Sequence, residues 1–178
     1  MARIAAGDEP AFRRLARRYL PRALGLARKV LANDADAEEI AQEALLRVWL
    51  NAARWRPTAA FRTWFYRIVL NLCLNRRRRA PFAHLDAAGD PPDPRPDAAA
   101  ELERHETERA VAAAIAALPE RQHAAIVLTY HEGLSNAETA SILGTTVSGV
   151  ETLLVRAKRS LRAALVASVH NNRGMKRS

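Results

Sequence analysis

The chain has 178 residues, enough for one ordinary domain or two small ones, and 49% of them are hydrophobic and 26% charged, as in folded globular proteins. This composition excludes a disordered chain, and no stretch reaches the roughly 20 apolar residues that cross a bilayer. The 28 basic residues outnumber the 19 acidic ones, and nearly all of them are arginine, which binds phosphate well. The formal charge of +9 predicts a polyanionic partner, although a basic surface that only keeps the protein soluble remains an alternative.

The cysteine content and the N-terminus predict where the chain works. Cys73 is the single cysteine, so no internal disulfide and no CxxC metal pair can form. The first residues lack the apolar core of a secretory signal. We therefore expect a cytoplasmic protein with no cofactor and no metal ion.

The residue pattern predicts an all-α fold of two small helical domains. Glycine is rare, Ala, Leu and Arg are abundant, and no run alternates β-branched or aromatic residues with polar ones. Five of the nine prolines lie between residues 81 and 100, together with four aspartates, so this stretch cannot sustain a helix. The expected division is a first domain at 1–80, an acidic proline-rich linker at 81–102, a second domain at 103–168, and a basic tail at 169–178.

In the first domain, Asp8 is expected to cap a helix, and a second helix is expected after Pro21. Asp36 and Glu39 have the spacing of a capping box that opens the next helix. One face of that helix is apolar, and the opposite face carries polar and acidic residues: Glu38, Glu39, Gln42 and Glu43. From the residues alone, a docking surface for a basic partner and a plain solvated face are equally good explanations.

After an interruption at Asn51–Thr58, a long helix is expected from Ala59 to Arg78. Six arginines and no acid fall between Phe61 and Ala80, interleaved with aromatic residues, which is typical of proteins that bind unpaired nucleic acid. Trp64 and Phe65 lie on the apolar stripe and are expected in the core with Cys73. Trp55 and Tyr66 are expected to be exposed.

The second domain contains the most specific motif. A helix is expected to end at Pro119, and a buried helix to follow from Glu120 to Glu132 and to close at Gly133. Ser135 and Glu138 then form a second capping box, Gly144 supplies a left-handed turn, and Thr146 caps the following helix. This spacing predicts a helix-turn-helix, with an ordinary helical hairpin as the alternative.

The second helix of this motif presents residues to the major groove of DNA. Its outward positions are Ser148, Glu151, Thr152 and Val155. Behind them lie basic residues suited to phosphates: Arg156, Lys158, Arg159 and Arg162. Glu151 would repel phosphates, but it can accept a hydrogen bond from a cytosine amino group.

Three motifs in order resemble the extracytoplasmic-function (ECF) sigma factors of bacterial RNA polymerase. The first runs from Asp36 to Glu43 and continues to Leu46 and Trp49. The second runs from Phe61 to Ile68 and through Asn71–Cys73 into the arginine run, and the third leads from Leu118 to Arg121 into the helix-turn-helix. The resemblance covers about residues 8–165.

The resemblance implies a sigma factor that binds core polymerase and both recognises and helps to open promoter DNA. It implies that Glu38, Glu39, Gln42 and Glu43 contact the clamp helices of the largest polymerase subunit. It assigns minus-ten recognition to Trp55, Arg62, Arg67, Asn71, Asn75 and Arg76. It assigns minus-thirty-five recognition to Ser148, Glu151, Thr152, Val155, Arg156, Lys158 and Arg159. An anti-sigma factor is a further implied partner.

A rival hypothesis is a stand-alone regulator that binds operator DNA as a dimer through the helix-turn-helix. An enzyme is not expected, because the sequence has no P-loop, dinucleotide-binding, HExxH or GxSxG motif. The five histidines show no ligand spacing with Cys73 or with each other.

Overall fold

The computed structural model describes residues 1–79 and 109–175, with 167–175 described by their backbone alone. This part of the chain is helical and contains no strand, which confirms the all-α expectation. The proposed linker, 81–102, lies outside the described residues, as do residues 103–108 at the expected start of the second domain.

The chain begins with the short helix α1 (Ala2–Ala5) and the long helix α2 (Glu9–Leu31). Asp8 caps α2 as predicted, because its carboxylate accepts a hydrogen bond from the Ala11 amide at 2.8 Å. The expected break at Pro21 was wrong, since α2 runs through this proline without interruption. The apolar face continues on both sides of Pro21, from Tyr19 to Leu26, so its burial offsets the hydrogen bond that the proline cannot donate.

Helix α3 (Asp34–Leu50) begins three residues earlier than the Asp36 capping box predicts. Asn33 is the actual cap, and its side chain accepts from the Asp36 amide at 2.9 Å. The carboxylate of Asp36 is instead held by Arg76 of a later helix. Ile40, Ala44, Leu45 and Val48 are buried on one face of α3, as predicted.

A 3-10 turn, η1 (Ala52–Arg54), and an irregular segment lead into α4 (Phe61–Arg79). The predicted bounds of this helix agree within two residues. Phe65 and Cys73 are fully buried, as predicted. Tyr66 was expected to be exposed and is instead buried, because residues of the C-terminal half of the chain cover it.

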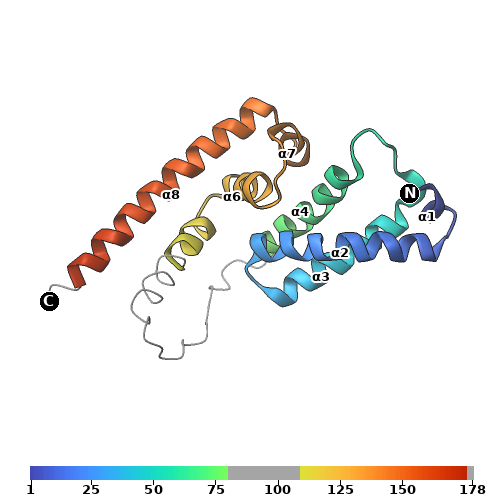
Figure 1. Ribbon diagram of the computed structural model, residues 1–178, viewed down its shortest axis with the longest axis horizontal. Helices are drawn as coiled ribbons and strands as arrows, with labels where there is room; N and C mark the ends of the chain where they lie inside the picture. The colour runs from blue at the N-terminus through green and yellow to red at the C-terminus, as the bar shows by residue number, and fades with distance from the viewer. Residues whose placement is uncertain (80–108, 176–178) are drawn as a thin grey trace.

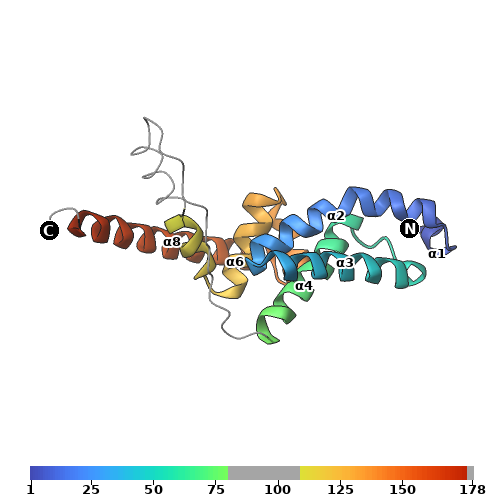
Figure 2. The ribbon, with the colours of Figure 1, turned by 90° about the horizontal axis from the view of Figure 1, so that it is seen from below.

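The C-terminal half starts with a helix at 109–116 and continues with α6 (Glu120–Ile126), which merges into the π-helical turn η2 (Val127–His131). Its apolar segment, 124–128, is buried as predicted, and Gly133 ends the turn with a φ of +62°. Then follow α7 (Asn136–Leu143) and α8 (Val147–Met175). Figure 2 shows the C-terminal part of α8 projecting beyond the other helices.

The two halves of the chain share one hydrophobic core. Figure 1 shows α4 between the pair α2–α3 and the helices α6 and α7. Five apolar residues of the C-terminal half join the buried cluster of α2, α3 and α4, namely Ala124, Val127, Leu128, Leu134 and Ile142. A smaller cluster around Val150, Leu154 and Ala157 forms the core of the helix-turn-helix itself.

Candidate functional site

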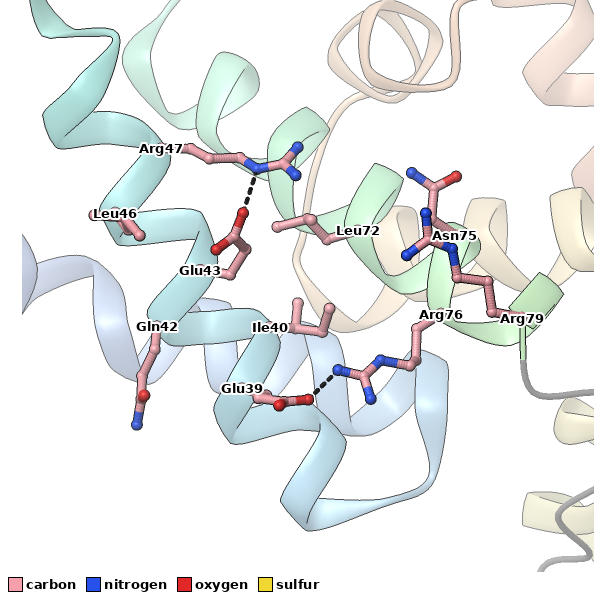
Figure 3. A pocket seen from close by; sticks show the side chains of 10 residues that line it. All are labelled: Glu39, Ile40, Gln42, Glu43, Leu46, Arg47, Leu72, Asn75, Arg76 and Arg79. Atoms are coloured by element: carbon pink, nitrogen blue, oxygen red, sulfur yellow. Dashed lines mark hydrogen bonds and ion pairs between the residues drawn. The ribbon is translucent and has the colours of Figure 1, made fainter.

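A groove runs between α3 and the C-terminal half of α4 and encloses about 570 Å³. Glu39 and Glu43 of α3 lie on one wall, and Arg76 and Arg79 of α4 lie on the other (Figure 3). The ion pairs that Figure 3 draws are Glu39 with Arg76 and Glu43 with Arg47, the second at 2.8 Å. Glu38 and Gln42 lie outside these pairs and are exposed, so α3 presents acids both in the groove and beside it.

Two leucines on the exposed side of α3 were not expected there. Leu46 is 50% exposed and Leu50 is 67% exposed. Leu46 follows Gln42 by about one helical turn, and Leu50 follows Leu46 by another. An apolar strip flanked by acidic side chains is typical of a protein docking surface, because burial of the leucines supplies affinity and the charges supply orientation. We call this strip and its acids the α3 face: Glu38, Glu39, Gln42, Glu43, Leu46 and Leu50.

The residues expected to recognise the minus-ten element fall into separate groups. Arg67, Asn71 and Asn75 are exposed and lie along one line of α4. Arg76 lies about 100° further round the helix and donates to Asp36 at 2.9 Å and to Glu39. Arg62 is about 140° away from Arg67, and it faces α7. The structure therefore brings Arg67, Asn71 and Asn75 together and places Arg62 and Arg76 elsewhere.

The segment before α4 rests on a cluster of aromatic rings. Phe61 is the centre of this cluster, with ring centroids 4.8 Å from Tyr19, 5.6 Å from Trp64 and 6.5 Å from Trp55. Trp55 is half-buried, and its indole N–H is shielded from solvent and has no acceptor within the described residues. An unpaired shielded donor costs free energy, so a ligand that accepts from it would gain affinity.

The helix-turn-helix has the local geometry that its sequence predicts. The Ser135 hydroxyl accepts from the Glu138 amide at 3.2 Å, and the Glu138 carboxylate accepts from the Ser135 amide at 2.9 Å. Gly144 has a φ of +61°, which a residue with a Cβ atom adopts only with strain. Thr146 caps α8 by accepting from the Gly149 amide at 3.0 Å. The two helices of the motif are α7 and the start of α8.

The outward positions of α8 are exposed as predicted. They are Ser148, Glu151, Thr152, Val155, Arg156, Lys158 and Arg159. The hydroxyl of Thr152 donates to the Ser148 carbonyl at 2.9 Å, which leaves its methyl group and the two lone pairs of its oxygen for a ligand. The ammonium of Lys158 lies 5.1 Å from the centre of the Tyr130 ring, a cation–π contact that orients it.

Comparisons with known proteins agree with this geometry. Residues 15–81 match the Sigma-70 region 2 family and residues 108–161 match Sigma-70 region 4. The chain is 38% identical over 160 residues to the ECF RNA polymerase sigma factor SigM of Mycobacterium tuberculosis, covering 90% of this chain and 80% of SigM. The chain belongs to the ECF sigma factor family. It is also 32% identical to SigW of Bacillus subtilis, covering 89% of this chain and 91% of SigW.

Solved structures of sigma factors share the fold. CnrH in complex with the cytosolic domain of CnrY superimposes with a TM-score of 0.70 at 30% identity, covering 93% of this chain and 94% of CnrH. The sigma factor RpoE of Bartonella quintana, in complex with the anti-sigma factor NepR, gives a TM-score of 0.64 at 18% identity, covering 87% of this chain and 96% of that one. This sigma factor directs RNA polymerase to promoters.

The sigma factor has polar contacts between its two halves that the sequence did not suggest. Arg62 of α4 donates to Glu138 of α7 at 2.5 Å, and the Tyr66 hydroxyl donates to Glu132 at 2.7 Å. The hydrogen bond from Arg62 holds the pKa of Glu138 below its ordinary value. Glu138 thus both caps α7 and ties it to α4. The apolar run at 124–128 was the only sign in the sequence that the two halves pack together, because a helix that is apolar on all sides must be covered by several other elements.

His123 is a buried polar residue of the same interface. Its Nδ1 atom lies 3.1 Å from a guanidinium nitrogen of Arg77, so the neutral ring accepts this hydrogen bond. Burial, and then the charges of Arg77 and His131, lower the pKa of His123 from 6.5 to about 4.

This lowered pKa predicts that acid destabilises the sigma factor. The unfolded chain protonates His123 near pH 6.5 and the folded chain only near pH 4. The contribution of the neutral His123 ring to the free energy of unfolding is therefore complete above pH 6.5 and is lost as the pH falls from 6.5 to 4. The free energy of unfolding should fall in this window by up to ~1.4 kcal/mol per pH unit. Urea unfolding at a series of pH values measures the slope, and His123→Gln should remove this part of it. Parallel curves for the two proteins would contradict the assignment.

Within the described residues no group of three His, Cys, Asp or Glu side chains is placed to hold a metal ion. In the same part of the chain, no helix is long and apolar enough to span a membrane.

Proposed function

We propose that the two outer surfaces of this sigma factor have different partners: the α3 face binds core RNA polymerase, and the exposed sides of α4 and α8 bind promoter DNA. The observation that carries this proposal is the separation of charge. The α3 face presents acids around exposed leucines, whereas the outward side of α8 carries three basic residues, Arg156, Lys158 and Arg159, beside a single acid. The apolar strip with its acids suits a protein partner, whereas the basic side of α8 attracts a polyanion.

A basic helical partner on the polymerase is oriented by the polar residues of the α3 face, namely Glu38, Glu39, Gln42 and Glu43. Leu46 and Leu50 are buried against the same partner. Burial of the two leucine side chains on binding supplies affinity, and this hydrophobic contribution does not depend on a precise orientation. Glu39 and Glu43 already have arginine partners within the chain, so the groove is held in one shape before docking. Such preorganisation reduces the entropy lost on binding.

Minus-ten recognition is assigned to one line of α4 and to the segment before it. Arg67, Asn71 and Asn75 offer one positive charge and two amides to a strand that follows the helix. The segment before α4 contains Trp55, whose shielded indole N–H has no partner within the described residues. Arg76 takes no part, because it is bound to α3. Arg62 becomes available only when Glu138 and the C-terminal half move away.

Minus-thirty-five recognition is assigned to α8, with different roles for its residues. Arg156→Ala should weaken binding to all sequences and reduce the slope of log affinity against log salt by about one, since a contact to one duplex phosphate is lost. Thr152→Ala should change base preference at one position and leave the salt slope unaltered. Binding of the polymerase complex to a library of promoter variants, at several salt concentrations, measures both. Equal, sequence-independent losses in the two variants would contradict direct readout by Thr152.

The chain is not an enzyme in this proposal but an initiation factor that works beside the polymerase in the cytoplasm. An anti-sigma partner is a further part of the proposal, and the family members CnrH and RpoE, each solved in complex with another protein, motivate it. A protein bound across α4 and α7 would hold the two halves together and keep Arg62 on Glu138.

Transcription from genomic DNA tests the proposed function. The full chain is added to purified bacterial core polymerase, and the start sites of all transcripts are mapped. Start sites that share two upstream sequence elements at constant spacing are expected. The rival, a dimeric regulator, predicts no new transcripts and a footprint of two half-sites without polymerase; that pair of results would overturn the proposal.

A further inference from the structure

Helix α2 carries a row of arginines that none of the assigned surfaces uses. Arg14, Arg18 and Arg22 recur every four residues, so their side chains lie along one line of the helix, about 6 Å apart along its axis. All three are exposed. None of them forms an ion pair within the described residues, where Arg13 and Arg28 of the same helix both have carboxylate partners.

Like charges at this spacing weaken a helix, because each repels the next. The row is therefore not explained by the stability of α2. On the neighbouring line of the helix, Arg13 lies about 100° from Arg14, and Arg17 lies about 60° from Arg14 and about 100° from Arg18. A linear anionic ligand along the row would relieve the repulsion.

The row is held in place by the aromatic cluster. The guanidinium carbons of Arg18 and Arg22 lie 5.8 and 5.5 Å from the centre of the Tyr19 ring. Tyr19 in turn packs edge-on against Phe61 and Phe65, with centroids 4.8 and 5.3 Å apart. Two arginines of α2 are thereby supported by the same rings that support the start of α4.

The row also points toward the start of α4. Burial raises the pKa of Tyr66, whereas the charges of Arg22 on α2 and Arg62 on α4 both act to lower it. Figure 1 shows the start of α2 and the segment before α4 at the same end of the molecule. The row on α2 thus begins at the end of the molecule that also holds the segment before α4.

We propose that Arg14, Arg18 and Arg22 bind successive phosphates of the separated promoter strand beyond the minus-ten contacts; this rests on the proposed function. A single strand fits the row because phosphates follow one another along a line and neighbouring bases can stack on aromatic rings. The polymerase is assigned to the α3 face, because its acids require basic groups and its leucines require apolar groups on the partner, and DNA phosphates offer neither.

The test uses the full chain bound to core polymerase. The probe is a fluorescent DNA fragment that the wild-type complex has selected from genomic DNA, prepared with the minus-ten region and the bases after it unpaired. Arg14→Gln with Arg18→Gln removes two charges from the row. Arg13→Gln with Arg17→Gln is the matched control, since it removes two charges with the same spacing on the next line of α2.

The double variant in the row should reduce the slope of log affinity against log salt by about 1.4, the value for two single-strand phosphates, and the control should reduce it clearly less. An unchanged slope in the row variant overturns the proposal, and so do equal reductions in both variants. A row variant that loses affinity for core polymerase without DNA, at unchanged salt slope, overturns it in favour of a polymerase contact. If the wild-type complex selects no fragment, the proposed function itself fails, and the role of the row falls with it.

Discussion

Replacing Glu39 and Glu43 together by lysine should lower the affinity of the sigma factor for core RNA polymerase by at least ~100-fold. Like charges that face each other across an interface cost several kcal/mol, and 100-fold corresponds to about 2.7 kcal/mol. The two substitutions also remove the ion pairs with Arg76 and Arg47 that hold the groove in shape. Titration of labelled sigma factor with core polymerase in the absence of DNA measures the loss.

The matched control reverses two other exposed acids of the same half, Glu9 and Asp34, each of which also pairs with an arginine. Glu9→Lys with Asp34→Lys changes the net charge equally and should leave the affinity for core polymerase within a few-fold of wild type. Circular dichroism should show unchanged helicity for both doubles. If the control loses as much affinity as the groove variant, the attraction is a general charge effect and the assignment of the α3 face is wrong.

Phe65→Ala should reduce the free energy of unfolding by about 3–5 kcal/mol, the loss typical of a fully buried aromatic ring. Phe65 is completely buried and contacts Tyr19, Phe61 and Tyr66. Domains of this kind are stable by only about 5–15 kcal/mol, so this substitution should remove a large share of the total stability. Urea unfolding followed by circular dichroism gives the value.

Trp64→Ala is the comparison for this prediction. Trp64 is a neighbour on α4 with a half-exposed ring that contacts Phe61, so its loss should be clearly smaller. Equal losses of unfolding free energy in the two variants would show that the depth of burial of an aromatic ring does not determine its contribution to the stability of the protein.

Features of the fold that depend on nearby residues were predictable from the sequence. The capping box of Ser135 and Glu138, the left-handed Gly144 and the cap at Asp8 each depend on residues within three or four positions. Apolar periodicity gave the bounds of α4 within two residues, because one face of this helix is buried along its length. The helix-turn-helix and its exposed residues could be predicted for the same reason.

Features that depend on distant residues were not predictable. Local rules favour a break at Pro21 and a helix start at Asp36, but the shared apolar face keeps α2 continuous, and Asn33 caps α3 while Arg76, 40 residues away, binds Asp36. Tyr66 is buried by Glu132 and its neighbours from the C-terminal half. No pattern within α4 signals these partners.

The candidate surfaces show the same division. The acids of the α3 face and the basic side of α8 follow from helical spacing. Arg62 and Arg76 resemble the other arginines of α4 in sequence, yet Glu138 and Asp36, 76 and 40 residues away, bind them. The row on α2 has no distinct pattern in the sequence, because its arginines are spread along an amphipathic helix and its link to α4 through Tyr19 exists only in the folded chain.

Site-specific photocrosslinking in the open promoter complex tests the division between polymerase and DNA surfaces most directly. A photoreactive amino acid is placed at Gln42, at Asn71 or at Val155, all of which are exposed. The position on α3 should crosslink to the largest polymerase subunit, and the positions on α4 and α8 should crosslink to DNA. Crosslinking of position 42 to DNA, or of positions 71 and 155 to polymerase alone in an active complex, would contradict the account.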